Sequence, residues 1–254
     1  GKVTEPSKGR PTGQDWPTFR HDEKRSGSTP VSVGGSGTLW SVQVAHPPVE
    51  GPVTSDWAFN PKVSGPLSSP VVAGNFVYVA LPDTHQVVAL DHSTGKPAWR
   101  FTAGGRIDSP PTVYGNLVIF GSADGWVYCL RGDDGMLVWR FRGAPANRRI
   151  VVLGQLESAW PIHGSVLVDK GTLVVAAGRS SYLDGGIHVY RLNPRTGQRL
   201  SETVIPSPAP KTGDQPAGGV DLRGVLNDVL AASGGTVYMR HLRLDLKTGN
   251  DLQT

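Results

Sequence analysis

The side chains best suited to chemistry gather in one polar stretch, FRGAPANRRIVVLGQLESAWPIHGS, which runs from Phe141 to Ser165. It contains Glu157 and His163, residue types that act as general acids and bases within hydrogen-bond distance of a reacting atom. A second polar stretch, GRSSYLDGG, adds Asp184. We predict Glu157, His163 and Asp184 as the catalytic candidates. Structural alternatives stay open, because a single histidine often donates to a backbone carbonyl and an aspartate before two glycines is typical of a turn.

The same two stretches carry side chains that could hold a polar ligand. Arginine binds carboxylates through two parallel hydrogen bonds, and tryptophan offers an apolar surface to a sugar ring. The predicted ligand-binding residues are Arg148, Arg149, Gln155, Trp160, Arg179, Ser180 and Ser181. We expect a small polar molecule or a saccharide as the ligand. An alternative for Arg179 is a structural ion pair with Glu157.

A repeat of about forty residues surrounds these stretches. SSPVVAGNFVYVALPDTHQVVALDHSTGKPAWRF aligns with DSPPTVYGNLVIFGSADGWVYCLRGDDGMLVWRF, which places Trp99 and Trp139 40 residues apart. Each copy contains four short strands separated by turn residues, the pattern of a β-propeller blade. The predicted strands are 70–73, 76–80, 87–90 and 98–101 in the first copy and 110–114, 117–120, 126–130 and 138–141 in the second.

Two later copies, SVLVDKGTLVVAAGRSSYLDGGIHVYRLNPRTGQRL and in part DVLAASGGTVYMRHLRLDLKTGN, bring the chain to about four blades or part-blades. The predicted fold class is all-β, a propeller of four-stranded antiparallel blades. The third copy is stretched, since Gly115 to Gly171 spans 56 residues where about 40 are expected. We place its insertions at 141–164 and 178–186, on one face over the central axis, where loops carry binding groups. Other loops of that face would add Trp57, Asp83, His85, Arg106, Asp108 and Asp124.

The turns ALDHSTGKPAW and CLRGDDGMLVW resemble the repeat of the pyrroloquinoline-quinone-type, or quinoprotein-like, β-propellers. The resemblance extends from about residue 39 to 249. It implies that the outer-strand tryptophans Trp40, Trp99 and Trp139 dock across neighbouring blades, and that the whole ring has seven or eight blades. The repeat weakens late, because Ser201 takes the position of Trp99.

The opening stretch DWPTFRHDEKRSGST resembles the lead-in of large secreted propeller proteins of this type. We therefore expect a lead-in at 1–38 and a partial propeller at 39–254, with a Pro/Gly-rich connection at 202–225. Closure of a ring needs more blades than these residues supply. The resemblance thus implies a segment of a longer, exported protein that works in the periplasm or outside the cell.

The family resembled includes quinone-dependent dehydrogenases and a non-enzymatic lipoprotein of outer-membrane barrel assembly, so the fold alone does not define a function. The first hypothesis is an exported propeller domain whose polar axial site binds a ligand and could act on it catalytically. The second is a PQQ-dependent oxidoreductase of alcohols or sugars, and the third is a non-enzymatic scaffold for a protein partner. PQQ with Ca²⁺ is implied by the resemblance alone. The single cysteine cannot form the vicinal cysteine pair typical of the dehydrogenases, and no calcium ligand is assigned.

Composition and motifs argue against several other classes of protein. The net charge is only +4 and the basic residues are spread along the chain, which disfavours nucleic-acid binding. No apolar stretch approaches the roughly 18–20 residues that a membrane span needs. Cys129, inside the alternating run WVYCL, is predicted to be a buried structural thiol. The motifs of zinc proteases, serine hydrolases and nucleotide-binding enzymes do not occur in a fitting context.

Overall fold

Antiparallel β-sheets make up the protein in its computed structural model, which describes residues 14–32, 34–35, 37–45, 65–152, 154–206 and 226–245. The regular elements of this part of the chain are the strands β1 to β17. No helix among the described residues is long and apolar enough to cross a membrane. The predicted all-β fold of antiparallel blades is confirmed.

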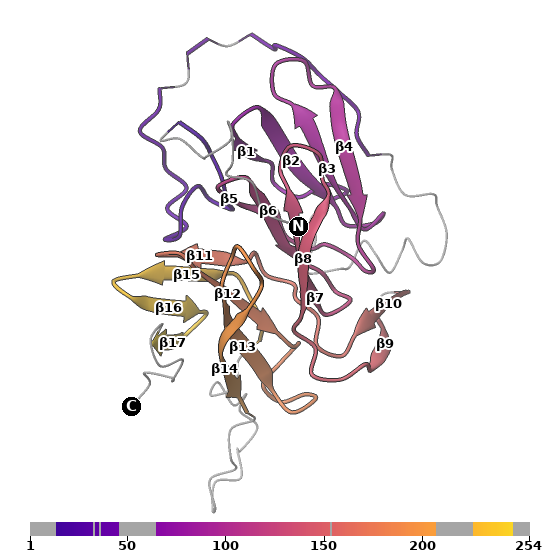
Figure 1. Ribbon diagram of the computed structural model, residues 1–254, viewed down its shortest axis with the longest axis vertical. Coiled ribbons are helices and arrows are strands. Elements are labelled where there is room, and N and C mark those ends of the chain that lie inside the picture. The colour runs from indigo at the N-terminus through magenta and orange to yellow at the C-terminus, as the bar shows by residue number, and fades with distance from the viewer. Residues whose placement is uncertain are drawn as a thin grey trace, which may run out of the picture.

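Three four-stranded sheets and one three-stranded sheet follow the repeat, and within each sheet the strands pair in sequence order (Figure 1). The first blade contains β1 (Val71–Ala73), β2 (Phe76–Leu81), β3 (Gln86–Asp91) and β4 (Pro97–Thr102). The second contains β5 (Thr112–Tyr114), β6 (Leu117–Gly121), β7 (Trp126–Arg131) and β8 (Leu137–Arg142). The third contains β11 (Leu167–Asp169), β12 (Thr172–Ala177), β13 (Ile187–Leu192) and β14 (Arg199–Ile205), and the fourth contains β15 (Leu230–Ser233), β16 (Thr236–Met239) and β17 (Leu242–Asp245).

The predicted strands of the first two blades are confirmed to within two residues at either end. The first hairpin of each of these blades turns at a glycine with positive φ, Gly74 at 58° and Gly115 at 63°, which a Cβ would disfavour. Middle strands such as β2 and β3 are buried over most of their length, whereas the outer strand β4 alternates between exposed and buried residues. Middle strands are therefore packed on both faces and outer strands on one.

Tryptophan docking locks successive blades together, as the repeat implied. The Trp99 indole N–H donates to the carbonyl of Gly132 in the next blade at 2.7 Å. Its ring covers Gly135, where a Cβ would lie 2.6 Å from the ring and where φ is +71°. Trp40 and Trp139 make the corresponding hydrogen bonds with turns of the first and third blades, at 2.8 and 3.1 Å.

The hydrophobic core lies between the blades rather than inside any one of them. One cluster joins the first and second blades and includes Tyr78, Phe120 and Tyr128. A second joins the second and third blades and includes Cys129 and Tyr190, and a third joins the third and fourth blades. Cys129 is fully buried and unpaired, which confirms its structural role, and burial raises the pKa of its thiol.

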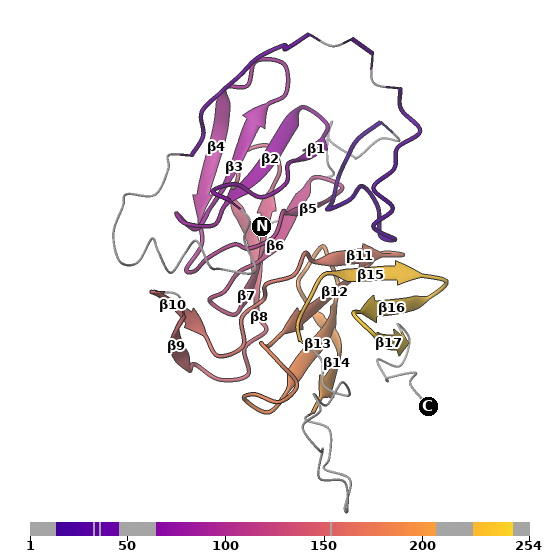
Figure 2. The ribbon, with the colours of Figure 1, turned by 180° about the vertical axis from the view of Figure 1, so that it is seen from behind.

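The first described part of the lead-in lies against the inner strands, and the indigo trace then arcs around the outside of the first blade (Figures 1 and 2). Trp16 pairs with Val72 of β1, and the carbonyl of Pro17 accepts a hydrogen bond from the Val113 N–H of β5 at 2.7 Å. Further along, the carbonyl of Glu23 accepts from the Ala232 N–H of β15 at 2.7 Å.

Arg25 is the centre of this lead-in contact and is itself buried. Its guanidinium donates to the carbonyl of Leu230 at 2.8 Å and to that of Val166 at 3.3 Å, and so joins the inner sides of the fourth and third blades. It also donates to the Thr18 hydroxyl at 2.7 Å, which lies 2.8 Å from the hydroxyl of Thr112 in the second blade. The lead-in therefore contacts all four described blades.

The polar stretch between the second and third blades forms a hairpin that the sequence did not reveal. Its strands are β9 (Arg149–Val152) and β10 (Gln155–Ser158), a two-stranded sheet separate from the blades. Leu156 lies opposite Val151, and Glu157 lies opposite Ile150. Alternation places Glu157 on the buried side, whereas Val151 and Leu156 share the exposed side.

Candidate functional site

A cavity of about 450 Å³ opens on the axial side of the propeller. Most of its wall comes from the connections that lead into the inner strands of all four described blades. Phe19 of the lead-in, Pro82 after β2 and Arg240 between β16 and β17 complete it. Its polar lining includes Ser69, Asp108, Ser109, His163, Asp228 and Arg240. Of the ten predicted site residues, only His163 lines this cavity.

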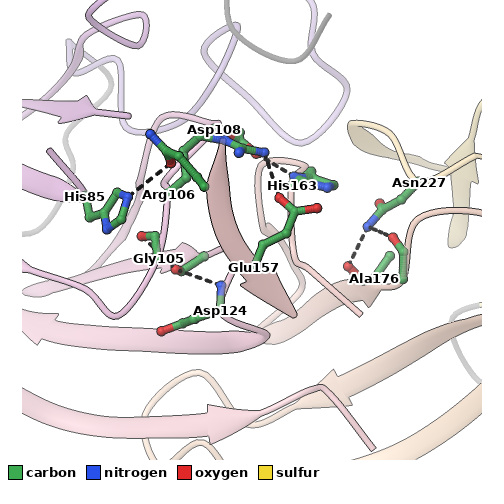
Figure 3. Close-up of polar contacts among 12 residues, drawn as sticks. His85, Gly105, Arg106, Asp108, Asp124, Glu157, His163, Ala176 and Asn227 are labelled. Atoms are coloured by element: carbon green, nitrogen blue, oxygen red, sulfur yellow. Dashed lines mark hydrogen bonds and ion pairs between the residues drawn. The ribbon is translucent and has the colours of Figure 1, made fainter. Parts of the chain in front are cut away.

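His163 belongs to a buried group of four charged or ionisable side chains (Figure 3). Its Nδ1 lies 2.5 Å from Oδ2 of Asp108. Arg106 donates through Nε to Oδ1 of Asp108, and through Nη2 to Oε2 of Glu157 at 3.0 Å. We call Arg106, Asp108, Glu157 and His163 the buried quartet.

The quartet joins two connections far apart in the sequence. Arg106 and Asp108 come from the connection between β4 and β5, and Glu157 comes from β10. His163 follows the hairpin, just before β11. Two backbone hydrogen bonds fix the hairpin to the second blade, from Ser158 N–H to the carbonyl of Ala123 at 2.7 Å and from Ile162 N–H to that of Ser122 at 3.1 Å.

Burial and charge shift the two carboxyl groups of the quartet in opposite directions. Burial disfavours the ionised form of Asp108, but its hydrogen bonds and attraction to His163 and Arg106 prevail and lower its pKa. Burial raises the pKa of Glu157, and the positive charges of His163 and Arg106 offset this only in part. Oε1 of Glu157 has no hydrogen-bond partner among the described residues. Asp108 is therefore the ionised partner of His163, and Glu157 holds its proton more firmly than usual.

A second polar group lies where the two insertions meet. Asp184 forms ion pairs with Arg148 and with Arg179, the latter at 2.5 Å. The Trp160 indole N–H donates to the Asp184 carbonyl at 3.0 Å, and the Arg148 guanidinium lies 5.3 Å from the centre of the Trp160 ring. The alternative of an Arg179–Glu157 bridge is not observed, since each residue has a different partner. Asp184 has a φ of +57° and both its carboxylate oxygens engaged, so it is held by the fold.

The remaining predicted residues are dispersed. Arg149 is exposed on the hairpin. Gln155 Oε1 lies 3.2 Å from His85 Nε2, which links the hairpin to the first blade. Ser180 and Ser181 are buried, and the Ser180 hydroxyl accepts a hydrogen bond from the backbone of Tyr182 within the loop. Trp57 lies outside the described residues.

From the sequence, Asp108 and Arg106 were predicted only to lie in loops on the same face as the insertions. No role was predicted for Ser109, Asp228 or Arg240, which line the cavity. A signal existed in their positions, because Ser109 and Asp228 precede the inner strands of the second and fourth blades and Arg240 joins two strands of the fourth. Which side chains point toward the axis depends on loop conformation, and the strand register does not determine that.

The Ca²⁺ implied by the resemblance does not fit the residues described here. Among them, no group of three or more His, Cys, Asp or Glu side chains could hold a metal ion. Asp108, the buried carboxylate of the cavity wall, already accepts from Arg106 and His163 through both of its oxygens. Calcium prefers six to eight oxygen ligands, so the described cavity does not supply a Ca²⁺ site.

The blades, their tryptophan docking and the axial cavity define a β-propeller built from quinoprotein-like repeats. Residues 31–252 match the family model described as outer membrane protein assembly factor BamB. The match covers most of the chain, and the protein therefore belongs to this family.

Relatives with known activities share the fold over part of their length. The quinoprotein alcohol dehydrogenase PedH of Pseudomonas putida is 27% identical over 157 residues, which are 57% of this chain and 24% of PedH. The structure of the quinohemoprotein alcohol dehydrogenase ADHIIG of Pseudomonas putida HK5 has a TM-score of 0.62 at 15% identity, over 95% of this chain and 40% of that one. The quinohemoprotein alcohol dehydrogenase of Comamonas testosteroni has a TM-score of 0.52 at 19% identity, over 75% and 27%. This chain thus spans less than half of each dehydrogenase, and the structural likeness concerns the fold alone.

Proposed function

We propose that the axial cavity binds a small polar molecule and that His163 exchanges a proton with it. The observation that carries this proposal is the position of His163, which lines the cavity while its Nδ1 contacts the buried carboxylate of Asp108. A carboxylate at Nδ1 fixes the imidazole so that Nε2 is the atom left for a ligand. Nε2 of His163 has no hydrogen-bond partner among the described residues.

The other quartet members act as positioning residues in this proposal. Arg106 connects Asp108 to Glu157, so the hairpin stabilises the orientation of His163 through two ion pairs. A series of hydrogen-bonded side chains of this kind holds a reacting group in place without touching the ligand. Asp184, the third catalytic candidate, is bound to two arginines and is proposed to fix the hairpin against the 178–186 loop.

The test replaces His163 by asparagine in the full-length protein. The amide of His163→Asn can still donate to Asp108 but has no equivalent of Nε2. We expect this variant to lose ligand binding, measured by calorimetric titration against saccharides, small carboxylic acids, and PQQ with Ca²⁺. Its melting temperature is expected to stay close to that of the wild type. His188→Asn is the matched control, because His188 Nδ1 contacts Glu202 at 2.9 Å on the outer surface of the third blade. Undiminished binding in His163→Asn would contradict the proposal, and saturable binding of PQQ with Ca²⁺ would favour the oxidoreductase hypothesis.

A second candidate function is a scaffold for a protein partner, and the hairpin favours it. Val151 and Leu156 lie opposite each other in the hairpin and are 73% and 52% exposed. The hairpin is held by the first, second and third blades, so this apolar pair is presented rigidly. Paired exposed hydrophobic side chains on a rigid element are typical of interaction sites.

Cross-linking in cells distinguishes this second function. A photoreactive residue at position 156 is expected to form a discrete adduct with one protein. The control is position 200, since Leu200 is also 52% exposed but lies on β14. Equal adducts at both positions, or none at 156, would count against the scaffold.

We also propose that the protein works outside the cytoplasm. The proposal rests on the family description, which refers to assembly of outer-membrane proteins. Cell fractionation of the full-length protein tests it, and recovery of the protein in the cytoplasmic fraction alone would contradict it.

A further inference from the structure

The carboxylates that line the axial cavity are already engaged by the protein. Asp108 accepts from Arg106 and from His163. Asp228 forms an ion pair with Nε of Arg240 at 2.9 Å, and its other oxygen accepts from the backbone N–H of the following residue at 2.7 Å. Neither acid therefore has an oxygen without a protein partner to offer a ligand.

Three side chains that line the cavity are able to donate hydrogen bonds to a ligand. The Ser109 hydroxyl is buried, at 5% residue exposure, and has no partner in the described residues. Arg240 contacts Asp228 through Nε, and its two Nη groups have no contact with the described residues. Protonated His163 adds an Nε2–H. Three donors from three connections thus face one cavity.

The quartet places a buried carboxylate, Asp108, against the His163 ring. Two carboxylates face a single guanidinium, so once Glu157 is ionised the quartet with neutral His163 carries one excess negative charge. Burying an uncompensated charge is costly. The titratable groups that face His163 are Asp108, Glu157 and Arg106 within the quartet and Asp228 and Arg240 of the cavity. Protonation of His163 balances the quartet and presents a cationic donor to the cavity.

We propose that the ligand of the axial cavity is a small carboxylate, bound by protonated His163, the Ser109 hydroxyl and the Arg240 guanidinium. This inference rests on the proposed function of the cavity and adds the chemical class of the ligand. A carboxylate accepts several donors at once, and arginine binds it with matching geometry. The ligand carboxylate compensates the charge of His163, and binding is therefore coupled to proton uptake.

Calorimetric titration of the full-length protein with sodium malonate tests the inference, with chloride keeping the ionic strength constant. Heats measured in two buffers of different ionisation enthalpy give the number of protons taken up. We expect saturable binding with uptake of up to one proton. Because binding takes up a proton, the affinity is expected to fall as the pH rises. Sorbitol is the neutral comparison and is expected not to bind.

Two variants locate the anion. Arg240→Gln is expected to weaken malonate binding about tenfold, the usual value of one charge-assisted hydrogen bond. His163→Asn is expected to abolish the proton uptake and the pH dependence. Arg243→Gln is the matched control, because Arg243 is an exposed arginine of the same blade that does not line the cavity. Its affinity for malonate is expected to equal that of the wild type.

The outcomes separate this inference from the function on which it rests. Binding of sorbitol without malonate would overturn the carboxylate class and leave the cavity as a ligand site. Malonate binding that is unchanged in both Arg240→Gln and His163→Asn would overturn the inference by placing the anion elsewhere. No binding of any compound, together with an unchanged His163 ring signal in the NMR spectrum, would overturn both proposals.

Discussion

Glu157 is held in the buried quartet by a single ion pair, and burial raises its pKa. A carboxyl group with a raised pKa binds its proton more tightly in the folded chain than in the unfolded chain. Its contribution to stability is fully present below the ordinary value of 4.5 and is lost as the pH rises through the raised pKa. The amide of Glu157→Gln does not titrate, so the free energy of unfolding of this variant should lack that decline.

Urea unfolding of wild type and Glu157→Gln between pH 4.5 and the neutral range measures the effect. The control is Glu202→Gln. Burial disfavours ionised Glu202, but its hydrogen bonds to His188 and Tyr190 lower its pKa, so its contribution is lost as the pH falls instead. Parallel pH profiles of Glu157→Gln and wild type would show that Glu157 is not the titrating group.

For the quartet, two of the four residues could be predicted from the sequence. Glu157 and His163 were predicted because their types and their place in a long insertion favour chemistry. Their partners come from a connection about fifty residues earlier, and side-chain direction in such a loop has no periodicity to reveal it. The same limit applies to Asp184, the third catalytic candidate, because its pairing with Arg148 and Arg179 depends on two loops that meet only in space.

Among the elements, the outer strands have the most predictable role. Trp99 joins β4 to the turn of the next blade through a hydrogen bond and through ring contact with Gly135. Trp99→Ala removes a large buried side chain and is expected to destabilise the protein by about 3–5 kcal/mol. Thermal and urea unfolding measure the loss.

A second substitution examines the same contact from the other side. Gly135→Ala would place a Cβ 2.6 Å from the Trp99 ring at a φ of +71°, so it is expected to destabilise as well. Because both changes disrupt one contact, their effects should not add in the double variant. Fully additive losses would mean that tryptophan docking is not the shared cause.

The lead-in is the element whose role the sequence did not reveal. Its resemblance to other lead-ins identified the segment, but its contacts with four blades depend on backbone carbonyls that no side-chain pattern encodes. Arg25→Met keeps much of the apolar length of the side chain and removes its hydrogen bonds to Leu230, Val166 and Thr18. Carbonyls left unpaired in a buried site cost about 1–3 kcal/mol each.

We therefore expect Arg25→Met to lower the melting temperature and to increase proteolysis within the lead-in. Arg20→Met is the control, because Arg20 is an exposed arginine of the same segment. Equal melting temperatures for Arg25→Met and the wild type would mean that the lead-in does not stabilise the blades.

Over the whole molecule, the seams between blades are not equivalent. Tryptophans bridge the first seam and the second, whereas Ser201 takes the tryptophan position on the outer strand of the third blade. A small void lies at this third seam, lined by Val174, Val189 and Ser201 on one side and Val237 and Leu244 on the other. The late weakening of the repeat was predictable from the sequence, and it falls at the seam where this void lies.

Stability should therefore be lowest at the third seam, and local opening should begin there. In hydrogen exchange we expect the amides of β16 and β17 to lose protection before those of β2, β3, β6 and β7.

The axial cavity connects this seam to the proposed function, because Asp228 and Arg240 of the fourth blade line the cavity together with His163. A ligand that contacts both blades there should stabilise the seam by about 2.7 kcal/mol at a concentration of one hundred times its Kd. Exchange in β16 and β17 should then slow by about one hundredfold while β2 and β3 change less, whereas a uniform change across all blades would place the binding site away from the third seam.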